Sequence, residues 1–258
     1  MRLQLLRRIG LASVARWLNR ASKRRYWEEA WGRDDYAPPW LGRGVAAEVV
    51  AAVRDGWFAR GGAALDIGCG QGEIVAWLAE QGFDVVGVDI SEAALARGRA
   101  LVGASRAREA SSANRASSAR STNGAARAEF RRVDICAPAP SSLEPNRFAI
   151  LIDRGCFHQI ADEDLPAFAA NVVRVAAPDA RFLLFVKAFR GAAAGDAGDA
   201  AAERARHIAR VEGALGAAFA IERVTDTALD ADEGRVAERR LPGLVFWMTR
   251  RPLREAHA

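Results

Sequence analysis

The stretch over residues 63–91, AALDIGCGQGEIVAWLAEQGFDVVGVDIS, constrains the fold more than any other part of this chain. Its two apolar runs, rich in β-branched residues, are typical of buried parallel strands. Between them the glycine-rich turn at residues 68–72 allows a sharp bend and the close approach of a ligand, and the helix that follows begins with free N–H groups. Asp89 ends the second run. The pattern predicts a strand–turn–helix–strand unit with a nucleotide site, in which Asp89 accepts the ribose hydroxyls.

The spacing of the glycines indicates which nucleotide is bound. Dinucleotide enzymes use G-x-G-x-x-G, whose turn directs a helix N-terminus at a pyrophosphate. Here the pattern is G-x-G-x-G, with Asp66 two residues before the first glycine and Glu73 directly after the last. Two carboxylates beside the turn disfavour phosphates and suit a ligand with an ammonium or sulfonium charge. An NAD-dependent Rossmann oxidoreductase remains the alternative.

On these residues the stretch resembles the class I S-adenosylmethionine-dependent methyltransferases. Their first motif is an acidic residue, then G-x-G-x-G, then an acidic residue that closes the next strand. The resemblance implies S-adenosylmethionine as the cofactor, with its amino acid part near Asp66 and the glycine turn, and its ribose on Asp89. It also implies that the protein is a methyl-transferring enzyme.

Tyr26–Leu41, YWEEAWGRDDYAPPWL, is an unusually aromatic segment. Trp27 and Trp31 are four residues apart and share a helix face, and two prolines deliver Trp40 in extended chain. The tryptophans either protect an edge of the core or cover the donor and acceptor. The segment resembles the N-terminal part of the thiopurine, thiol and halide methyltransferases, whose tryptophans contact the cofactor. That resemblance implies the same contacts here.

Two later strands end on further candidate residues. Phe130–Asp134 is the expected third strand. The resemblance implies that Asp134 and the backbone at Ile135 contact adenine, and the alternative is that Asp134 ends the strand and caps the loop. Phe148–Asp153 is the expected fourth strand; Asp153 orients donor or acceptor, or alternatively caps the next turn. His158 is a general base if its pKa lies near neutrality, whereas packing beneath the turn is the preferred alternative.

The two resemblances together assign a set of residues to the cofactor site. These are Trp27, Trp31, Trp40, Asp66, Gly68, Cys69, Gly70, Gly72, Asp89, Ile90, Asp134, Ile135 and Asp153. Asp153 and His158 are the catalytic candidates. The D/N-P-P-[YFW] motif of enzymes that methylate base amino groups is absent from the sequence.

Charge is distributed unevenly along the chain. The net charge is +5, yet residues 1–27 carry eight basic residues and no acidic one, and residues 103–128 carry a net +4. The rest therefore holds a net −7. Nucleic-acid enzymes usually carry their positive patch on the folded body, so this distribution argues against a nucleic-acid partner.

The composition predicts a single α/β domain, residues 26–258, preceded by a basic extension, residues 1–25. The extension shows an amphipathic pattern that allows weak contact with an anionic membrane surface, although a surface helix packed on the domain is preferred. Residues 103–128 consist mainly of Ala, Ser and Arg without an apolar anchor, which predicts a flexible insert. The three cysteines are too few for a disulfide framework or a zinc site and fit a reducing cytoplasm.

The expected fold is a Rossmann-like, doubly wound α/β domain with a seven-stranded, mostly parallel sheet and an antiparallel last strand. Helices are expected to run from an N-cap at Ser91 to about Leu101 and over two later stretches, with His207 on the surface of the second. The two later helices are expected at Asp162–Ala176 and Ala200–Ala218. The last two strands are expected at Phe219–Asp226 and Leu244–Thr249.

The predicted function is methyl transfer from S-adenosylmethionine to a small-molecule acceptor, a thiol or a halide, without a metal. The alternatives are methylation of protein or nucleic acid, the NAD-dependent oxidoreductase, and a non-catalytic binding protein. Acceptor specificity depends on variable loops, so the sequence identifies neither the acceptor nor the oligomeric state.

Overall fold

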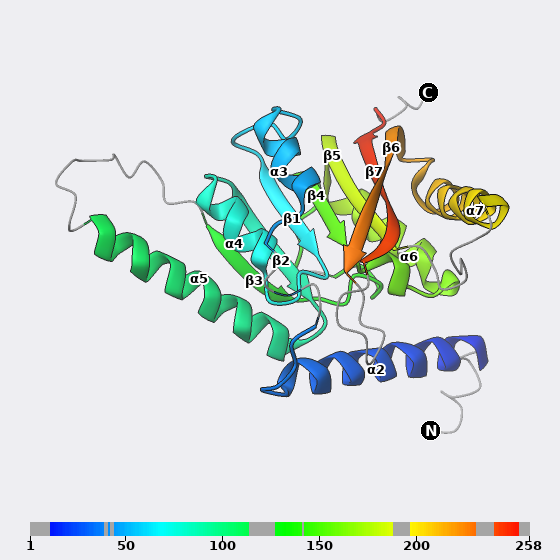
Figure 1. Cartoon of the computed structure of the whole chain (residues 1–258). Helices are drawn as coiled ribbons and strands as arrows, with labels where there is room; N and C mark the ends of the chain where they lie inside the picture. Colours follow the sequence, from blue (N-terminus) through cyan, green and yellow to red (C-terminus); the bar gives the residue numbers. More distant parts are fainter. Residues whose placement is uncertain are drawn as a thin grey trace.

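The computed structural model describes residues 11–38, 41, 44–113, 127–140, 142–187, 197–230 and 240–252. Within these ranges the strands form one seven-stranded sheet in the order β3-β2-β1-β4-β5-β7-β6 (Figure 1). The strands are β1 (Ala63–Ile67), β2 (Asp84–Asp89), β3 (Ala128–Arg132), β4 (Phe148–Arg154), β5 (Ala176–Lys187), β6 (Phe219–Asp230) and β7 (Arg240–Arg250). Strands β1 to β5 pair in parallel, and β7 is antiparallel to both β5 and β6. The predicted Rossmann-like fold with an antiparallel last strand is therefore confirmed.

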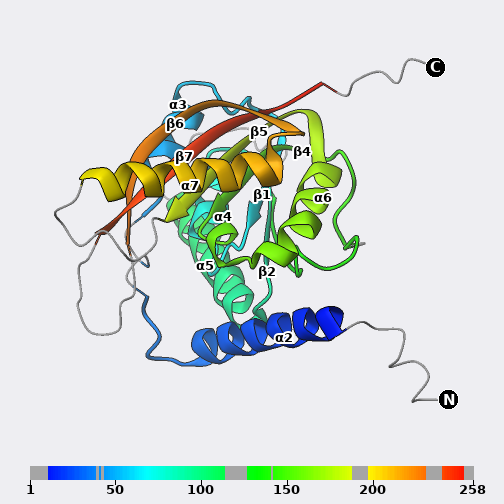
Figure 2. The same cartoon turned by 90° about the vertical axis from the view of Figure 1, so that its right-hand side faces the viewer.

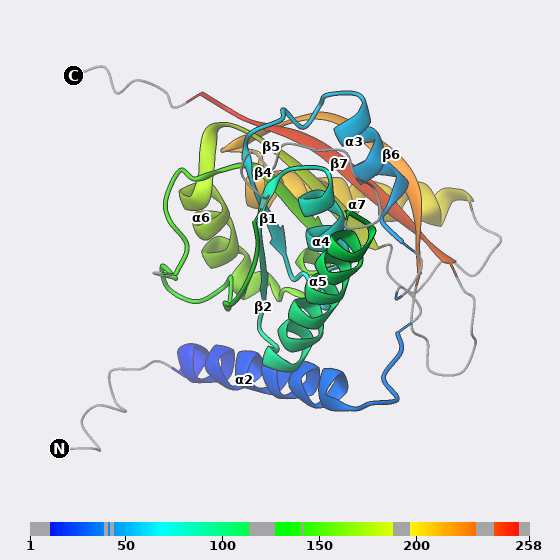
Figure 3. The same cartoon turned by 90° about the vertical axis from the view of Figure 1, so that its left-hand side faces the viewer.

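Helices cover both faces of the sheet. On one face, α3 (Ala47–Arg54) and α4 (Glu73–Glu80) bury apolar side chains against the strands, and on the other α6 (Leu165–Val175) and α7 (Ala197–Leu215) do the same. Figures 2 and 3 show these two layers from opposite sides. Parallel strands buried on both faces need the continuous apolar runs that the sequence contains.

The strand register brings the functional ends of three strands to one edge. In β1, Asp66 lies opposite Gly87 of β2 and Ile152 of β4, so Asp89 and Asp153 fall one or two residues further along their strands. In open α/β sheets, ligands bind at this carboxyl edge.

Helix α2 (Leu11–Gly32) runs across that edge. All three views show it lying beneath the strand ends, beside the start of α5 (Glu92–Ala113) (Figures 1, 2 and 3). The predicted boundary at residue 25 falls inside this helix, so residues 11–25 continue into the first helix of the domain. In the described part of the chain, no helix has the length and apolar character needed to cross a membrane. Membrane-surface contact stays a prediction.

Helix α5 differs from expectation in its length. Ser91 is its N-cap as predicted, because its Oγ accepts the N–H of Ala94 at 3.2 Å. The helix continues to Ala113 rather than ending near Leu101, since Ala, Arg and Glu favour helix. The prediction of a flexible insert from residue 103 is thus wrong for its first part, and residues 114–126 lie outside the described ranges.

Two expectations for the second half of the chain are corrected. The helix expected from Asp162 is split: a 3₁₀ turn, Asp162–Asp164, precedes α6, which has Pro166 in its first turn. Proline has no N–H to donate and is suited to this position. His207 is only 4% exposed. It lies one turn before buried Val211, on the inner face of α7, and not on the surface.

Candidate active site

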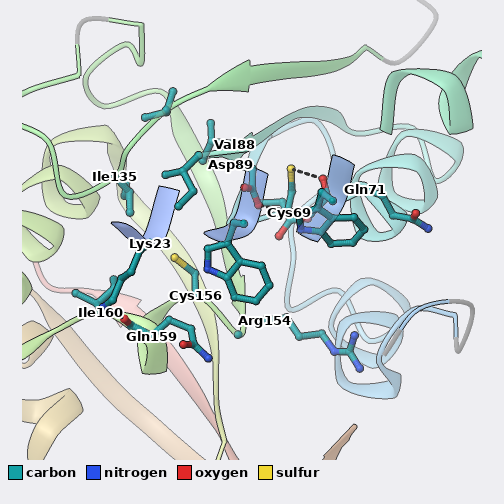
Figure 4. Close-up of a pocket in the computed structure, with 18 of the residues that line it drawn as sticks. Lys23, Cys69, Gln71, Val88, Asp89, Ile135, Arg154, Cys156, Gln159 and Ile160 are labelled. Atoms are coloured by element: carbon teal, nitrogen blue, oxygen red, sulfur yellow. Dashed lines mark hydrogen bonds between the residues drawn. The ribbon is translucent and has the colours of Figure 1, made fainter. Parts of the chain in front are cut away.

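A cavity of about 770 Å³ lies between α2 and the carboxyl ends of β1 to β4. Figure 4 shows Val88, Asp89 and Ile135 along one side and Cys156, Gln159 and Ile160 along the other. The predicted site residues that line it are Trp27, Trp31, Asp66, Gly68, Cys69, Gly70, Gly72, Asp89, Ile90, Asp134, Ile135 and His158. Of the remaining two, Asp153 does not line the cavity, and Trp40 lies outside the described residues.

The glycine turn is shaped by close contacts. Gly68, Gly70 and Gly72 have φ values of 69°, 54° and 73°, which L side chains rarely adopt. A Cβ at Gly68 would lie 2.6 Å from Cβ of Cys156, and one at Gly72 would lie 2.4 Å from Cε1 of Phe130. Side chains at these positions would displace the walls of the cavity.

Asp66 is a buried carboxyl with no hydrogen-bond partner among the described residues. It is 3% exposed and lines the cavity. Burial, together with the neighbouring carboxylates Asp153 and Asp89, raises its pKa to about 8, although the charge of Arg154 opposes the shift. An ammonium group placed here would supply the missing partner and favour the charged carboxylate.

Asp89 is held by the backbone at the end of β2. Its Oδ2 accepts the N–H of Gly70 at 3.0 Å, and its Oδ1 accepts the N–H of Ser91 at 2.9 Å. Burial raises its pKa, while these hydrogen bonds oppose that shift. Each carboxylate oxygen has more than one lone pair, so Asp89 can also accept the two hydroxyl hydrogens of a ribose.

The loop after β3 is fixed in a similar way. Asp134 Oδ1 accepts the N–H of Cys136 at 2.9 Å. Nδ2 of Asn171 donates to the carbonyls of Ile135 and Ala137 at 2.8 and 2.7 Å. These hydrogen bonds hold Asp134 and Ile135 at the cavity wall, and their contact with adenine stays a prediction.

Asp153 acts on the backbone instead of the ligand. It is fully buried, and Oδ1 accepts the N–H groups of Gly155, Cys156 and Phe157 at 3.1, 2.8 and 3.1 Å. Burial raises its pKa to about 7, opposed by these N–H groups. The expected direct contact with donor or acceptor is not what the structure shows, because the carboxylate caps the turn beneath the cavity floor. The alternative of a turn cap is the observed arrangement.

His158 lines the cavity from the 3₁₀ turn Phe157–Gln159. Its Nδ1 is buried without a hydrogen-bond partner in the described part of the chain. Burial, together with the positive charges of Lys187 and Arg210, lowers its pKa to about 4. The condition set for a general base, a pKa near neutrality, is not met, and the ring is neutral at pH 7.

Trp31 and Trp27 both project from α2 into the cavity wall. Trp31 is 5% exposed and packs edge-on against Tyr36, with ring centroids 5.1 Å apart. The guanidinium of Arg97 lies 5.6 Å from its ring centroid. Trp27 and Trp31 therefore lie where a cover over the cavity would lie, and their contact with the cofactor stays a prediction.

Several residues of the cavity were missed by sequence reasoning. Arg20 and Lys23 reach it from α2, and Arg154 reaches it from the end of β4. The Nε of Arg154 is buried and has no hydrogen-bond partner within the described ranges. For the α2 residues a signal existed: Arg20, Lys23, Trp27 and Trp31 recur at spacings of three and four, which places them on one helix face.

The sheet order, the tight glycine turn and the carboxylate after β2 define a class I S-adenosylmethionine-dependent methyltransferase. The residues fit the donor, because a Cβ would fill the cradle at the turn and Asp66 lacks a partner. A sequence profile of the thiopurine S-methyltransferase family matches residues 22–242. The chain belongs to this family and is an S-adenosylmethionine-dependent methyltransferase.

Solved structures share the fold. A protein described in work on the conversion of a disulfide bond into a thioacetal group during echinomycin biosynthesis superposes with a TM-score of 0.66 at 20% identity, covering 91% of this chain and 94% of that one. Magnesium protoporphyrin IX methyltransferase from Synechocystis PCC 6803 with bound S-adenosylhomocysteine gives 0.58 at 17% identity, covering 90% and 100%. An S-adenosylmethionine-dependent methyltransferase from Methanosarcina mazei gives 0.56 at 17%, covering 81% and 99%.

Proposed function

We propose that this protein methylates the sulfur of a small-molecule thiol, bound as its thiolate between α2 and the carboxyl ends of the strands. The observation that carries the proposal is the position of α2 across the carboxyl edge of the sheet, where it closes one side of a cavity of about 770 Å³. Cavities of this size hold drug-sized ligands, and the donor takes up a large part of the space. An acceptor that enters the cavity between α2 and the strand ends must therefore be small.

The chain's own residues would hold both reactants in line. The carboxyl groups of Asp66, Asp89 and Asp134 would fix the two ends and the ribose of the donor. S-adenosylmethionine, when bound, supplies a methyl group already activated by a positively charged sulfur. The protein then contributes orientation and the exclusion of water by the tryptophans of α2.

Positively charged residues in the cavity wall favour an anionic nucleophile. Arg154 lines the cavity with a buried Nε that lacks a partner among the described residues. Lys23 lines it from α2, where its Nζ donates to the carbonyl of Gln159 at 2.5 Å. Positive charge lowers the pKa of a thiol and so raises the fraction of reactive thiolate. Because His158 is neutral with a low pKa, a nucleophile that arrives already ionised suits this site better than one that needs a strong base.

A halide is the second candidate from the sequence, but a single ion would leave most of the acceptor end unfilled. A protein or nucleic-acid acceptor would require α2 to move away from the strand ends.

The test is a screen for S-adenosylhomocysteine formation with an aromatic thiol such as thiophenol, an aliphatic thiol, iodide, and an unstructured peptide. Turnover with the aromatic thiol, reduced at least about tenfold in Arg154→Met by loss of a charged contact, is the expected result. Turnover with the peptide alone would overturn the proposal. Arg99→Met is the matched control, since Arg99 contacts only Glu92 among the described residues and lies outside the cavity.

A further inference from the structure

The first part of α2 lies outside the stretch that matches the family. The helix begins at Leu11, whereas the family match begins at residue 22. Arg20 precedes the matched residues and nevertheless lines the cavity. A basic extension that merely decorates the domain would not supply a residue to the site.

Arg20 contacts both the loop after β3 and the 3₁₀ turn that precedes α6. Its Nη1 donates a hydrogen bond to the carbonyl of Cys136 at 2.7 Å and lies 4.0 Å from Oδ1 of Asp164. The Asp164 side chain is only 6% exposed and that of Arg20 is 28% exposed. A charged hydrogen bond in such a shielded place is stronger than one at the surface.

The hydrogen bond from Arg20 adds to several others that hold residues 134–137 in place. The carbonyls of Ile135 and Ala137 are taken by Asn171, and the N–H of Cys136 by Asp134. The carbonyl of Cys136 is the one that Arg20 takes. Arg20 therefore closes a set of hydrogen bonds that sets the direction of the Asp134 carboxylate and of the Ile135 backbone.

We propose that Arg20 is a positioning residue for the donor: it acts through Cys136 to hold the Asp134–Ile135 segment in the geometry that receives adenine. The inference rests on the proposed placement of adenine at Asp134 and holds for any acceptor. It makes Arg20, which precedes the residues matched by the family profile, a part of the donor site.

The experiment is calorimetric titration of the full-length protein with S-adenosylhomocysteine. Arg20→Met keeps the apolar stem and removes the donors, Arg20→Lys keeps one charged donor, and Arg25→Met is the matched control. Arg25 lies on the same helix with its side chain 78% exposed and pairs only with Glu29 among the described residues. Asp89→Ala tests the donor site itself.

The dissociation constant is expected to rise about tenfold in Arg20→Met, to stay within about threefold of the wild type in Arg20→Lys, and to stay unchanged in Arg25→Met. Hydrogen exchange of the unliganded protein should quicken at residues 135–137 in Arg20→Met, where a simple loss of helix packing would quicken exchange along α2 instead.

Binding that is unchanged in Arg20→Met but lost in Asp89→Ala would overturn this inference and leave the donor site intact. Retained binding in Asp89→Ala would overturn the donor placement, and the inference with it. A loss of affinity in Arg20→Met that Arg20→Lys does not recover would also contradict the proposal. Neither the positive charge nor the hydrogen-bond donor of Arg20 would then explain the effect.

Discussion

The indole of Trp31 lies directly on the backbone of Gly70: a Cβ at Gly70 would come 3.1 Å from Cζ2 of the ring. One residue belongs to the helix that covers the site and the other to the turn that cradles the donor. Helix α2 and the glycine turn are therefore in direct contact at this point, without an intervening side chain. A displacement of Trp31 would be felt at Gly70.

Gly70→Ala is expected to weaken binding of S-adenosylhomocysteine about tenfold or more. The new methyl group would push Trp31 outward and would also require alanine at a φ of 54°. Gly56→Ala is the matched control, since Gly56 has a φ of 72° and nothing within 4 Å of its added Cβ. Equal loss of binding in both variants would show that strain elsewhere in the fold, and not this contact, controls affinity.

Glu28 fastens α2 to the helix that follows Asp89. Its carboxylate oxygens accept the N–H groups of Glu92 and Ala93 at 2.7 and 3.3 Å, at the N-terminus of α5. A carboxylate there is favoured by the free N–H groups and the helix dipole. Glu28→Gln is therefore expected to speed release of S-adenosylhomocysteine several-fold, measured by stopped-flow tryptophan fluorescence.

Glu29→Gln provides the control for that measurement. The Glu29 side chain is 72% exposed and contacts only Arg25 among the described residues. If both variants released the ligand at the wild-type rate, the contact of Glu28 with α5 would have no part in closing the site.

The parts of the site that could be predicted from sequence are those whose chemistry is local. Asp66, the glycine turn and Asp89 lie within one strand–turn–helix–strand unit, so their order along the chain determines their arrangement in space. The strands of the sheet could also be predicted, because each is a continuous apolar run in the sequence.

The missed contacts depend on partners that carry no sequence pattern. Arg20 and Lys23 bind the carbonyls of Cys136 and Gln159, more than a hundred residues away, and every residue has a carbonyl. The burial of His207 was accessible in principle, because Val211 and Leu215 mark its helix face at steps of four. For Asp153 the sequence offered both a ligand contact and a turn cap, and the choice between them depends on the conformation of Gly155, whose φ is 113°.

Asp153→Asn should act mainly on stability. Asparagine keeps one acceptor oxygen and turns an NH₂ group toward backbone donors, so the free energy of unfolding should fall by about 2 kcal/mol. Chemical denaturation measures this directly, with the exposed Asp179→Asn as control. An unchanged stability together with a large drop in turnover would instead support a direct catalytic role for Asp153.

Asp66 should make donor binding depend on pH. With its pKa raised to about 8 by burial, the carboxyl is mostly protonated in the free protein at neutral pH. An ammonium group favours the charged form, so binding of S-adenosylhomocysteine must release this proton, and affinity should rise from about pH 6 to about pH 8 by up to about tenfold per unit. Titration in two buffers with different ionisation heats should detect the proton release.

The Asp66 carboxyl should also make the free energy of unfolding depend on pH in a defined direction. Between the ordinary aspartate pKa, about 4, and about 8, the folded protein keeps a proton that the unfolded chain has lost. The contribution of Asp66 is thus most favourable at low pH and declines as pH rises through this window. Asp66→Asn should flatten both profiles, relative to Asp179→Asn, and weaken binding at pH 8. Proton uptake on binding, or a donor affinity independent of pH in the wild type, would remove Asp66 from the ammonium site.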